Sequence, residues 1–323
     1  MVNQIINGDA LEVLQTLPDS SINCCITSPP YFGLRDYGVD GQVGNESTPE
    51  EYVQKLTEIL TEVKRVLKDD GTLWLNLGDS YAGSNQGAGT KNPTAKQKSN
   101  RGTNYMTTVE HKSKLAKLPG LKAKDLIGIP WMVAFALRDD GWYLRQDIIW
   151  YKPNCMPESV KDRCTKSHEY IFMFSKSKKY YFDNEAIREP CVTNDTSSPR
   201  GSKGALTPNS GRRKQNQSCA VQGAEPNERC KQQKPPLLRN KRDVWSVSTK
   251  PCREAHFATF PDTLIEPCVL AGCPKGGIIL DPFLGSGTTA FVAARNKRNY
   301  IGIELNPEYI EIAQQRISQH CEQ

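Results

Sequence analysis

The stretch that decides the fold reads Gly-Ile-Ile-Leu-Asp-Pro-Phe-Leu-Gly-Ser-Gly-Thr-Thr-Ala and covers residues 277–290. Residues 277–280 form a short apolar run that predicts a buried strand, and residues 286–295 predict a helix. Between them, Gly285 and Gly287 permit a tight turn and a close approach of the backbone to a ligand. A strand, a glycine-rich turn and a helix in this order are typical of α/β domains that bind nucleotides.

The glycine turn alone leaves the ligand open. It is not a phosphate-binding Walker loop, because no lysine follows its last glycine, but its G-x-G-x-x-A pattern also suits a nicotinamide or flavin dinucleotide. Glu304, at the end of the next predicted strand, could accept both hydroxyls of a ribose. Asp281 opens the turn with a negative charge that would repel a pyrophosphate and attract the sulfonium and ammonium groups of S-adenosylmethionine. The sequence therefore favours S-adenosylmethionine over a dinucleotide.

Outward from this turn, predicted strands and helices alternate along the chain. Strands are predicted at residues 4–6, 22–26, 72–77, 143–151, 170–174, 277–280 and 300–303. Helical patterns occupy residues 11–17, 49–70, 126–137, 261–271, 286–295 and 307–318. Such alternation predicts an α/β fold built on a doubly wound, mostly parallel, seven-stranded Rossmann-like sheet.

A second distinctive stretch, Thr27-Ser28-Pro29-Pro30-Tyr31, follows the predicted strand at 22–26. Open α/β sheets bind their ligands at the carboxyl ends of their strands, so this stretch lies where a ligand is expected. Two prolines could also simply end the strand, with Tyr31 covering the core. The combination with the glycine turn favours a functional role.

Together the two stretches resemble the DNA amino-methyltransferases, whose catalytic motif is [Asp/Asn/Ser]-Pro-Pro-[Tyr/Phe/Trp] and whose cofactor motif contains Phe-x-Gly-x-Gly. Ser28, Pro29, Pro30 and Tyr31 match the first motif, and residues 283–287 match the second. The catalytic motif precedes the cofactor motif, as in the β class. The resemblance therefore implies a circularly permuted methyltransferase sheet, interrupted here by irregular basic insertions.

The resemblance implies that the methyl group of S-adenosylmethionine goes to an exocyclic amine of a base flipped out of double-stranded DNA. Tyr31 would stack on the flipped ring, while the Ser28 hydroxyl and the Pro29 carbonyl would accept hydrogen bonds from the amine. Ser28 favours N4 of cytosine, since Asp or Asn is commoner there in adenine-specific relatives, and N6 of adenine remains the alternative. Carbon-5 methylation would leave the Ser-Pro-Pro-Tyr stretch unexplained.

Further cofactor contacts follow from the resemblance, and no metal ion is expected. Asp9 and Ala10 resemble the motif whose acid reaches the adenine, and Phe260 and Pro261 resemble the segment beside the methionine moiety. The expected cofactor-binding residues are Asp9, Ala10, Phe260, Pro261, Asp281, Phe283, Gly285, Ser286, Gly287, Thr288 and Glu304.

Basic charge is confined to two segments that are rich in Gly, Ser, Asn, Gln and Pro. Residues 82–124 hold nine Lys/Arg against one Glu, and residues 190–242 hold eleven Lys/Arg against three Asp/Glu, although the whole chain carries only +6. Such segments could be solvated linkers or arms that follow a phosphate backbone, and the catalytic motif favours the second role. The residues expected to contact DNA are Arg212, Arg213, Arg239, Lys241 and Arg242.

We therefore expect a catalytic half at 1–189 with a basic insertion at 82–124, a target-recognition region at 190–245, and a cofactor-binding half at 246–323. The expected partner is double-stranded DNA, and a cognate restriction endonuclease could accompany the enzyme without touching it. Monomer and homodimer both remain open.

The eleven cysteines include no C-x-x-C pair, and the chain lacks a run of about 18 apolar residues. Together with the lack of a basic N-terminal region, this predicts a cytoplasmic protein.

Overall fold

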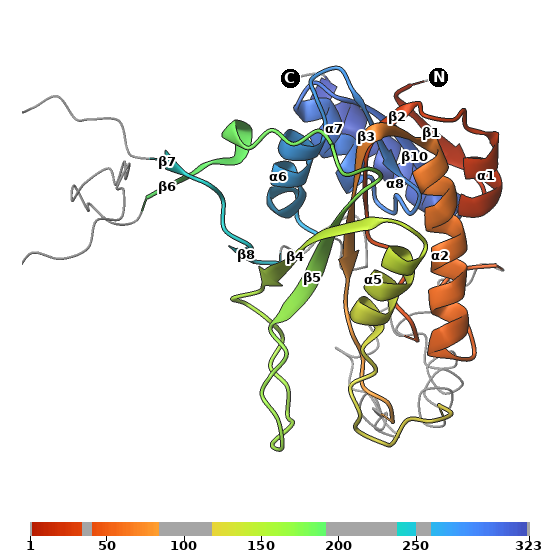
Figure 1. Cartoon of the computed structure of the whole chain (residues 1–323), viewed down its shortest axis with the longest axis vertical. Coiled ribbons are helices and arrows are strands. Elements are labelled where there is room, and N and C mark those ends of the chain that lie inside the picture. The colour runs from red at the N-terminus through yellow and green to blue at the C-terminus, as the bar shows by residue number, and fades with distance from the viewer. Residues whose placement is uncertain (1, 34–40, 84–117, 192–237, 250–259, 322–323) are drawn as a thin grey trace, which may run out of the picture. The chain divides into compact units, whose positions relative to one another are not determined.

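The computed structural model describes residues 2–33, 41–83, 118–191, 238–249 and 260–321. The chain divides into two compact units (Figure 1): residues 1–187 with 242–323 form the first, and residues 188–241 form the second. The second unit nearly coincides with the region 190–245 that we expected to recognise the target. Residues 242–245 lie in the first unit, where Val244 and Trp245 are part of a strand of its sheet, and recognition of the target by residues 190–245 stays a prediction.

The first unit contains one eight-stranded sheet. Its order is β1 (Gln4–Asn7), β10 (Asn299–Glu304), β9 (Ile278–Asp281), β2 (Ile22–Thr27), β3 (Leu67–Leu77), β5 (His168–Ser175), β4 (Tyr143–Tyr151) and β8 (Val244–Ser246). The strands from β1 to β3 are parallel to their neighbours, β5 runs antiparallel to both β3 and β4, and β8 is parallel to β4. The doubly wound, mostly parallel sheet is thus confirmed, with all seven expected strands and β8 as an eighth.

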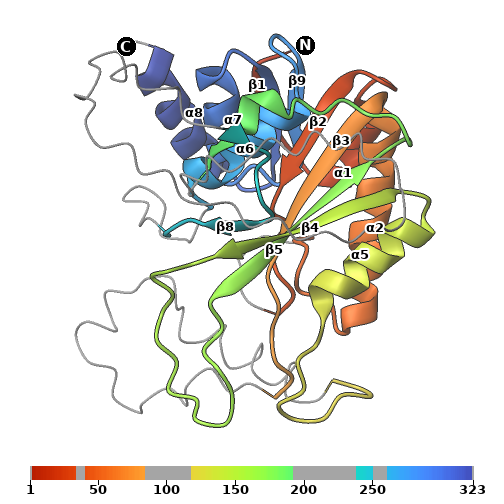
Figure 2. The ribbon, with the colours of Figure 1, turned by 60° about the vertical axis from the view of Figure 1, so that its left-hand side comes forward.

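Helices cover both faces of this sheet (Figures 1 and 2). They are α1 (Ala10–Thr16), α2 (Pro49–Val66), α5 (Ile129–Asp139), α6 (Asp262–Gly272), α7 (Thr288–Arg295) and α8 (Pro307–Cys321), with a 3-10 turn η1 at Glu185–Ile187. Buried side chains of α1, α2 and α5 share one apolar cluster with the sheet, whereas those of α6 and α7 share another. Burial on both faces explains why the central strands are continuous apolar runs rather than alternating ones.

Helix α2 illustrates how the sequence sets these boundaries. The Thr48 hydroxyl accepts a hydrogen bond from the Glu51 N–H, the Glu51 carboxylate accepts one from the Thr48 N–H, and Pro49 occupies the first turn. The expected helix extended to residue 70, but the observed one ends at Val66 because β3 already begins at Leu67. The pairing of β2 with β3 shifts register between Ile22 and Cys24, which accommodates the longer strand.

The second unit holds a two-stranded antiparallel sheet, β6 (Glu189–Pro190) with β7 (Leu238–Arg239). The Arg239 guanidinium lies 3.0 Å from the Glu189 carboxylate and joins the two strands.

Candidate active site

The tetrapeptide Ser28–Tyr31, which we expect to be catalytic, and the glycine turn directly follow neighbouring strands. Strands β2 and β9 are parallel, with Cys24 opposite Ile279 and Cys25 opposite Leu280. The residues that follow them therefore emerge at the same edge of the sheet. There the Thr27 hydroxyl donates a hydrogen bond of 2.6 Å to the Asp281 carboxylate. The tetrapeptide that contains Tyr31 and the turn that contains Gly285 consequently share one edge, as the assignment requires.

Asp281 is only 1% exposed, and its carboxylate is occupied by the protein itself. One oxygen accepts from Thr27 and from the Phe283 N–H, and the other accepts from the Thr289 hydroxyl at 2.6 Å. Burial raises the pKa of Asp281 to about 6, although these hydrogen bonds act in the opposite direction. The attraction to the cations of a cofactor that the sequence suggested stays a prediction, and the observed hydrogen bonds show that Asp281 also joins two loops.

Glu304 holds the glycine turn in place. Its two carboxylate oxygens accept from the Gly285 N–H at 2.7 Å and from the Asn306 N–H at 2.9 Å. Burial raises the pKa of Glu304, again against these hydrogen bonds. Asp9 lies at the same edge, because β1 pairs with β10 and places Asn7 opposite Glu304. The Asp9 carboxylate accepts from the N–H groups of Leu11 and Glu12 in the first turn of α1. Ala10 is the first residue of that helix.

The two glycines of the turn meet different requirements. Both have positive φ, +54° at Gly285 and +81° at Gly287. A Cβ on Gly287 would lie 2.7 Å from the Cβ of Ala313 in α8, whereas a Cβ on Gly285 would meet nothing within 4 Å. Gly287 thus permits the packing of two helices, and Gly285 borders open space in which a ligand could lie.

For the remaining expected cofactor residues, the structure shows their surroundings within the protein. The side chains of Ser286 and Thr288 are buried, and the Arg316 guanidinium donates to the Thr288 hydroxyl at 2.8 Å. Phe283 packs partly buried against the core, Phe260 packs against the cluster of α6 and α7, and Pro261 precedes α6. Their contacts with a cofactor remain predictions.

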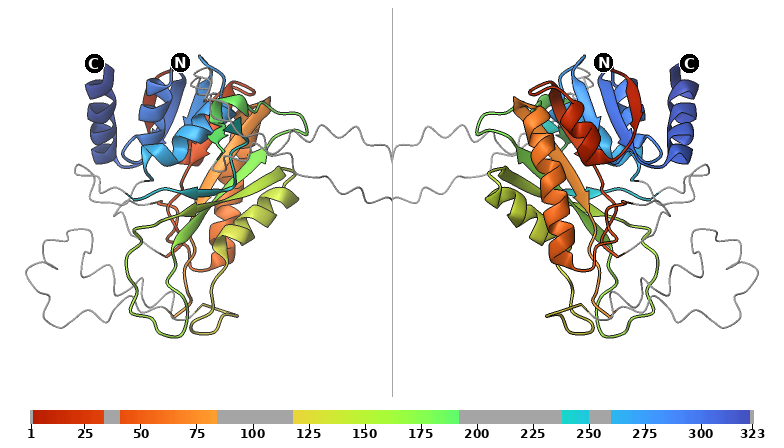
Figure 3. Two further views of the ribbon diagram at one scale, coloured as in Figure 1. Left: turned by 90° about the vertical axis from the view of Figure 1, so that its left-hand side faces the viewer. Right: turned by 90° about the vertical axis from the view of Figure 1, so that its right-hand side faces the viewer.

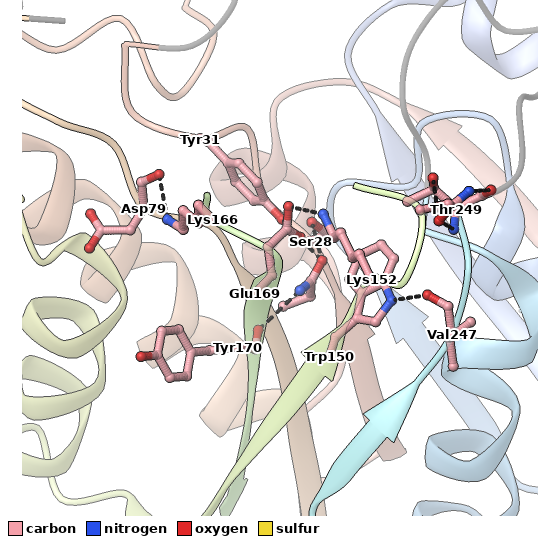
Figure 4. Close-up of polar contacts among 12 residues, drawn as sticks. Ser28, Tyr31, Asp79, Trp150, Lys152, Lys166, Glu169, Tyr170, Val247 and Thr249 are labelled. Atoms are coloured by element: carbon pink, nitrogen blue, oxygen red, sulfur yellow. Dashed lines mark hydrogen bonds and ion pairs between the residues drawn. The ribbon is translucent and has the colours of Figure 1, made fainter. Parts of the chain in front are cut away.

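The polar groups of the tetrapeptide converge on two residues that the sequence analysis missed (Figure 4). The Ser28 hydroxyl lies 3.3 Å from Oδ1 of Asn76 in β3, and the Tyr31 hydroxyl lies 3.1 Å from the same atom. The Tyr31 hydroxyl also donates to the Glu169 carboxylate in β5 at 2.8 Å. Asn76 Nδ2 donates to the Tyr170 carbonyl at 3.0 Å, which fixes the Asn76 amide with its oxygen toward the tetrapeptide.

The Tyr31 hydroxyl has one proton and can donate it to only one of these two acceptors. It donates to Glu169, which is charged and nearer. Asn76 Oδ1 therefore accepts its hydrogen bond from Ser28. Burial, together with the negative charge of Glu169, raises the pKa of Tyr31 well above 10. Tyr31 is therefore a neutral hydrogen-bond donor at physiological pH.

Glu169 in turn pairs with Lys152, the residue directly after β4. The Lys152 ammonium lies 4.1 Å from the centroid of the Trp150 ring, whose Nε1–H donates to the Val247 carbonyl at 2.8 Å. A chain of contacts thus runs from Tyr31 through Glu169 and Lys152 to Trp150 (Figure 4). A polar Asn76 inside the apolar run Leu-Trp-Leu-Asn-Leu, and an acid at the start of β5, are the signals that could have revealed this network.

The backbone around Tyr31 is equally constrained. A Cβ on Gly78 would lie 2.5 Å from Cε2 of the Tyr31 ring, so the ring rests directly on the backbone that follows β3. The Tyr52 hydroxyl donates to the Pro30 carbonyl at 2.8 Å. Among the described residues, no hydrogen bond is directed at the Pro29 carbonyl. Helix α2 and the end of β3 thus hold the tetrapeptide from two sides.

Of the residues expected to contact DNA, three lie within the described ranges. Arg239 pairs with Glu189, Lys241 follows in the same unit, and the Arg242 carbonyl accepts from Trp245 Nε1 at 2.7 Å. Arg212 and Arg213 lie outside the described residues. Contact of any of these with DNA stays a prediction.

Within the described ranges, no group of three or more His, Cys, Asp and Glu side chains is arranged to hold a metal ion. No helix in that part of the chain has the length and apolar character needed to cross a membrane.

Comparison with known proteins gives consistent matches. A family model for N6 and N4 methyltransferases, described as DNA methylase, matches residues 22–315. The type II methyltransferase M.Cfr9I of Citrobacter freundii is 47% identical over 313 residues, which cover 97% of this chain and 87% of that protein. M.SmaI of Serratia marcescens is 45% identical over 314 residues, with coverages of 97% and 90%.

Solved structures agree on the fold. The PvuII DNA methyltransferase, described as cytosine-N4-specific, superimposes with a TM-score of 0.61 at 19% identity, covering 98% of this chain and 86% of that chain. The complex of M1.HpyAVI with S-adenosylmethionine gives a TM-score of 0.52 at 18% identity, with coverages of 97% and 98%. At these identities the likeness establishes the architecture of the sheet and its helices.

Proposed function

The chain belongs to the N6/N4 family of DNA methylases, and from this premise we propose that it transfers a methyl group from S-adenosylmethionine to N4 of cytosine in double-stranded DNA. One observation carries the proposal. The Thr27–Asp281 hydrogen bond joins the catalytic tetrapeptide to the glycine turn at one edge of the sheet, so an amine held by the first lies beside a cofactor held by the second.

The residues at the glycine turn suit S-adenosylmethionine. The ligand is cationic, bears two ribose hydroxyls and has no phosphate. Glu304 uses two of about four lone-pair positions on its carboxylate for the Gly285 and Asn306 N–H groups, which leaves acceptor capacity for the ribose. Asp9 adds a second negative charge at this edge, and the open space beside Gly285 allows close approach.

The same contacts disfavour a dinucleotide. A pyrophosphate is bound by the N–H groups of a glycine turn at a helix N-terminus. Here the Gly285 N–H is already donated to the Glu304 carboxylate, which would also repel the phosphate. The nicotinamide and flavin alternatives therefore lose the donor on which they depend.

Recognition of the amine falls to Ser28 and Pro29. Because the Ser28 hydroxyl directs its proton toward Asn76 Oδ1, its lone pairs face outward and can accept an amine N–H. The Pro29 carbonyl can accept the second N–H, whereas the Pro30 carbonyl is engaged by Tyr52. Two such hydrogen bonds draw the nitrogen lone pair out of conjugation with the ring. Tyr31, anchored by Glu169, supplies the aromatic surface on which the flipped base stacks.

When bound, S-adenosylmethionine supplies an activated methyl group, so the protein contributes chiefly by positioning. The amine nitrogen forms a bond to the methyl carbon while the bond from that carbon to sulfur breaks. The nitrogen then loses its proton. Neither the Ser28 hydroxyl nor the Asn76 amide can hold that proton as a base at neutral pH, so the proton passes to water.

The choice of cytosine N4 rests on Ser28 as the first residue of the tetrapeptide. The structural neighbour from the PvuII system is itself described as cytosine-N4-specific, although the type II relatives carry names that specify no base. The names of these relatives also favour a modification enzyme of a restriction–modification system, with double-stranded DNA as substrate.

The test is incubation of the purified chain with unmethylated plasmid DNA and isotopically labelled S-adenosylmethionine, followed by mass analysis of the nucleosides. We expect labelled N4-methylcytosine. Labelled N6-methyladenine would refute the choice of base, and the absence of any methylated nucleoside would refute the activity. Tyr31→Ala is the matched control, in which methylation is lost while binding to the plasmid is retained.

A further inference from the structure

The connection between β4 and β5, residues 152–167, carries an exposed apolar side chain at the functional edge. Strand β5 begins where β3 ends, since Leu77 pairs with Tyr170, so this connection emerges beside the carboxyl ends of the parallel strands. Figure 3 shows it extending beyond that edge in both views. Met156, near its start, is 83% exposed, more than any other large hydrophobic residue in the described part of the chain.

The backbone that presents Met156 is firmly held. The Lys152 N–H donates to the Ser167 carbonyl at 2.8 Å and closes the base of the connection, and the Cys155 N–H donates back to the Lys152 carbonyl at 3.2 Å. Asn154 exchanges two hydrogen bonds of 2.9 Å with the backbone of Thr249. Pro157 follows Met156 and fixes its own φ. These hydrogen bonds hold the backbone of the turn in place, so Met156 is exposed because of the conformation of the turn and not because the turn unravels.

The returning half of the connection is braced as well. Arg163 donates to the Glu158 carboxylate at 2.5 Å and lies 4.1 Å from the centroid of the Tyr81 ring. The Lys166 ammonium donates to the Asp79 carbonyl at 2.7 Å, one residue beyond the Gly78 backbone on which Tyr31 rests. The same connection starts at Lys152, which pairs with the Glu169 that anchors Tyr31. Both ends of the connection therefore contact the surroundings of the catalytic tetrapeptide.

We propose that Met156 is the wedge that enters the base stack of DNA when the target base is flipped out. This inference rests on the proposed function, because only a flipped base leaves a gap to fill. Apolar side chains, methionine included, serve as such wedges between base steps, and the unbranched thioether adapts to an irregular gap beside aromatic rings. Exposed Lys161 on the same connection adds positive charge toward the phosphate backbone. A second copy of this chain would be a different occupant, and the test below separates the two.

The methylation site is first mapped by sequencing plasmid DNA that the chain has methylated. The test then compares two short duplexes that carry this site. In one duplex the target base is paired, and in the other an abasic position lies opposite it, so that the target base has no pairing partner and is easier to extrude. For Met156→Ala we expect kcat/KM to fall about tenfold on the paired duplex and to stay within about threefold of the wild-type value on the abasic one. Met156→Leu keeps the apolar bulk and should stay within about threefold on both. Val160→Ala, a second exposed apolar residue of the connection, is the matched control and should leave both rates unchanged.

Equal losses on the two duplexes, or no loss on either, would overturn the wedge. So would a change in the sedimentation of DNA-free Met156→Ala, which would mark the side chain as a contact between copies. If the wild-type chain methylates neither duplex, the proposed function itself fails. Because Met156 is exposed, its variants should keep the wild-type melting temperature, and this measurement accompanies the assay.

Discussion

Thr27 and Asp281, 254 positions apart in the chain, are joined by a hydrogen bond of 2.6 Å between hydroxyl and carboxylate. Each is the last residue of its strand, β2 and β9 respectively. The bond therefore sets the distance between the loop that would hold the base and the loop that would hold the cofactor. A change at this contact should alter stability and turnover together.

Thr27→Val tests this contact directly. Valine keeps the shape of threonine but leaves a carboxylate oxygen of Asp281 without its hydroxyl donor in a fully buried position. We expect the free energy of unfolding to fall by about 1–3 kcal/mol, measured by chemical denaturation. Thr27→Ser restores the hydroxyl and should recover most of the loss. A valine variant as stable as the wild type would show that the contact contributes nothing.

The pKa of Asp281 predicts a pH dependence. Because the folded state raises this pKa from 3.8 to about 6, the folded state favours the protonated acid. The stabilisation is fully present below pH 3.8 and is lost as the pH rises through about 6, and its full extent is about 3 kcal/mol. Asp281→Asn, which cannot ionise, should therefore gain stability relative to the wild type between about pH 4 and about pH 7. If the difference in free energy of unfolding between Asp281→Asn and the wild type stayed constant over this range, Asp281 would not have the raised pKa.

The bond between Tyr31 and Glu169 predicts non-additive kinetics. Tyr31→Phe keeps the ring and removes its anchor, and we expect kcat to fall about tenfold, the scale of one hydrogen bond to a charged group. Glu169→Gln removes the charge from the same contact. The double variant should lose little more than the worse single one, because both changes break one interaction. Full additivity of the two losses in kcat would mean that the residues act independently.

Gly78→Ala should separate cofactor binding from turnover. The new methyl group would lie 2.5 Å from Cε2 of Tyr31, so the ring must move away from its position. A displacement of about 1 Å can cost about a hundredfold in rate, and we expect a loss of this order in kcat. The thermal stabilisation by S-adenosylmethionine should persist, since Gly78 follows β3 and the glycine turn follows β9, with β2 between the two strands. Loss of both properties would indicate general unfolding instead.

The sequence predicted the sheet well because its strands are buried on both faces. Residues 278–280 are apolar throughout, residues 22–26 are apolar except for Asn23, and the glycine turn marks where a strand gives way to a helix. Strand β8 was missed because Val244–Ser246 is three residues long and only Trp245 among them is buried. Its place in the sheet is set by pairing with β4 rather than by any local pattern.

Only the part of the candidate site that lies within one short motif could be predicted from the sequence. Ser28 and Tyr31 could be assigned from their tetrapeptide, but their partners Asn76 and Glu169 come from two other strands, and sequence spacing says nothing about which strands are neighbours. Asp281 shows the same limit. Its charge suggested contact with a cation, which stays a prediction, and sequence spacing did not reveal the two threonine hydroxyls that donate to it.

The order β1-β10-β9-β2 has a consequence for biosynthesis. The two strands made first are separated by two strands made last. While the chain is still on the ribosome, β1 has no partner and β2 has one bare edge, and only the final segment can fill the gap between them. Such unpaired edges invite association between nascent chains. Completion of this sheet therefore waits for the synthesis of residues 278–304, and a chain that lacks this segment would leave β1 without its partner strand.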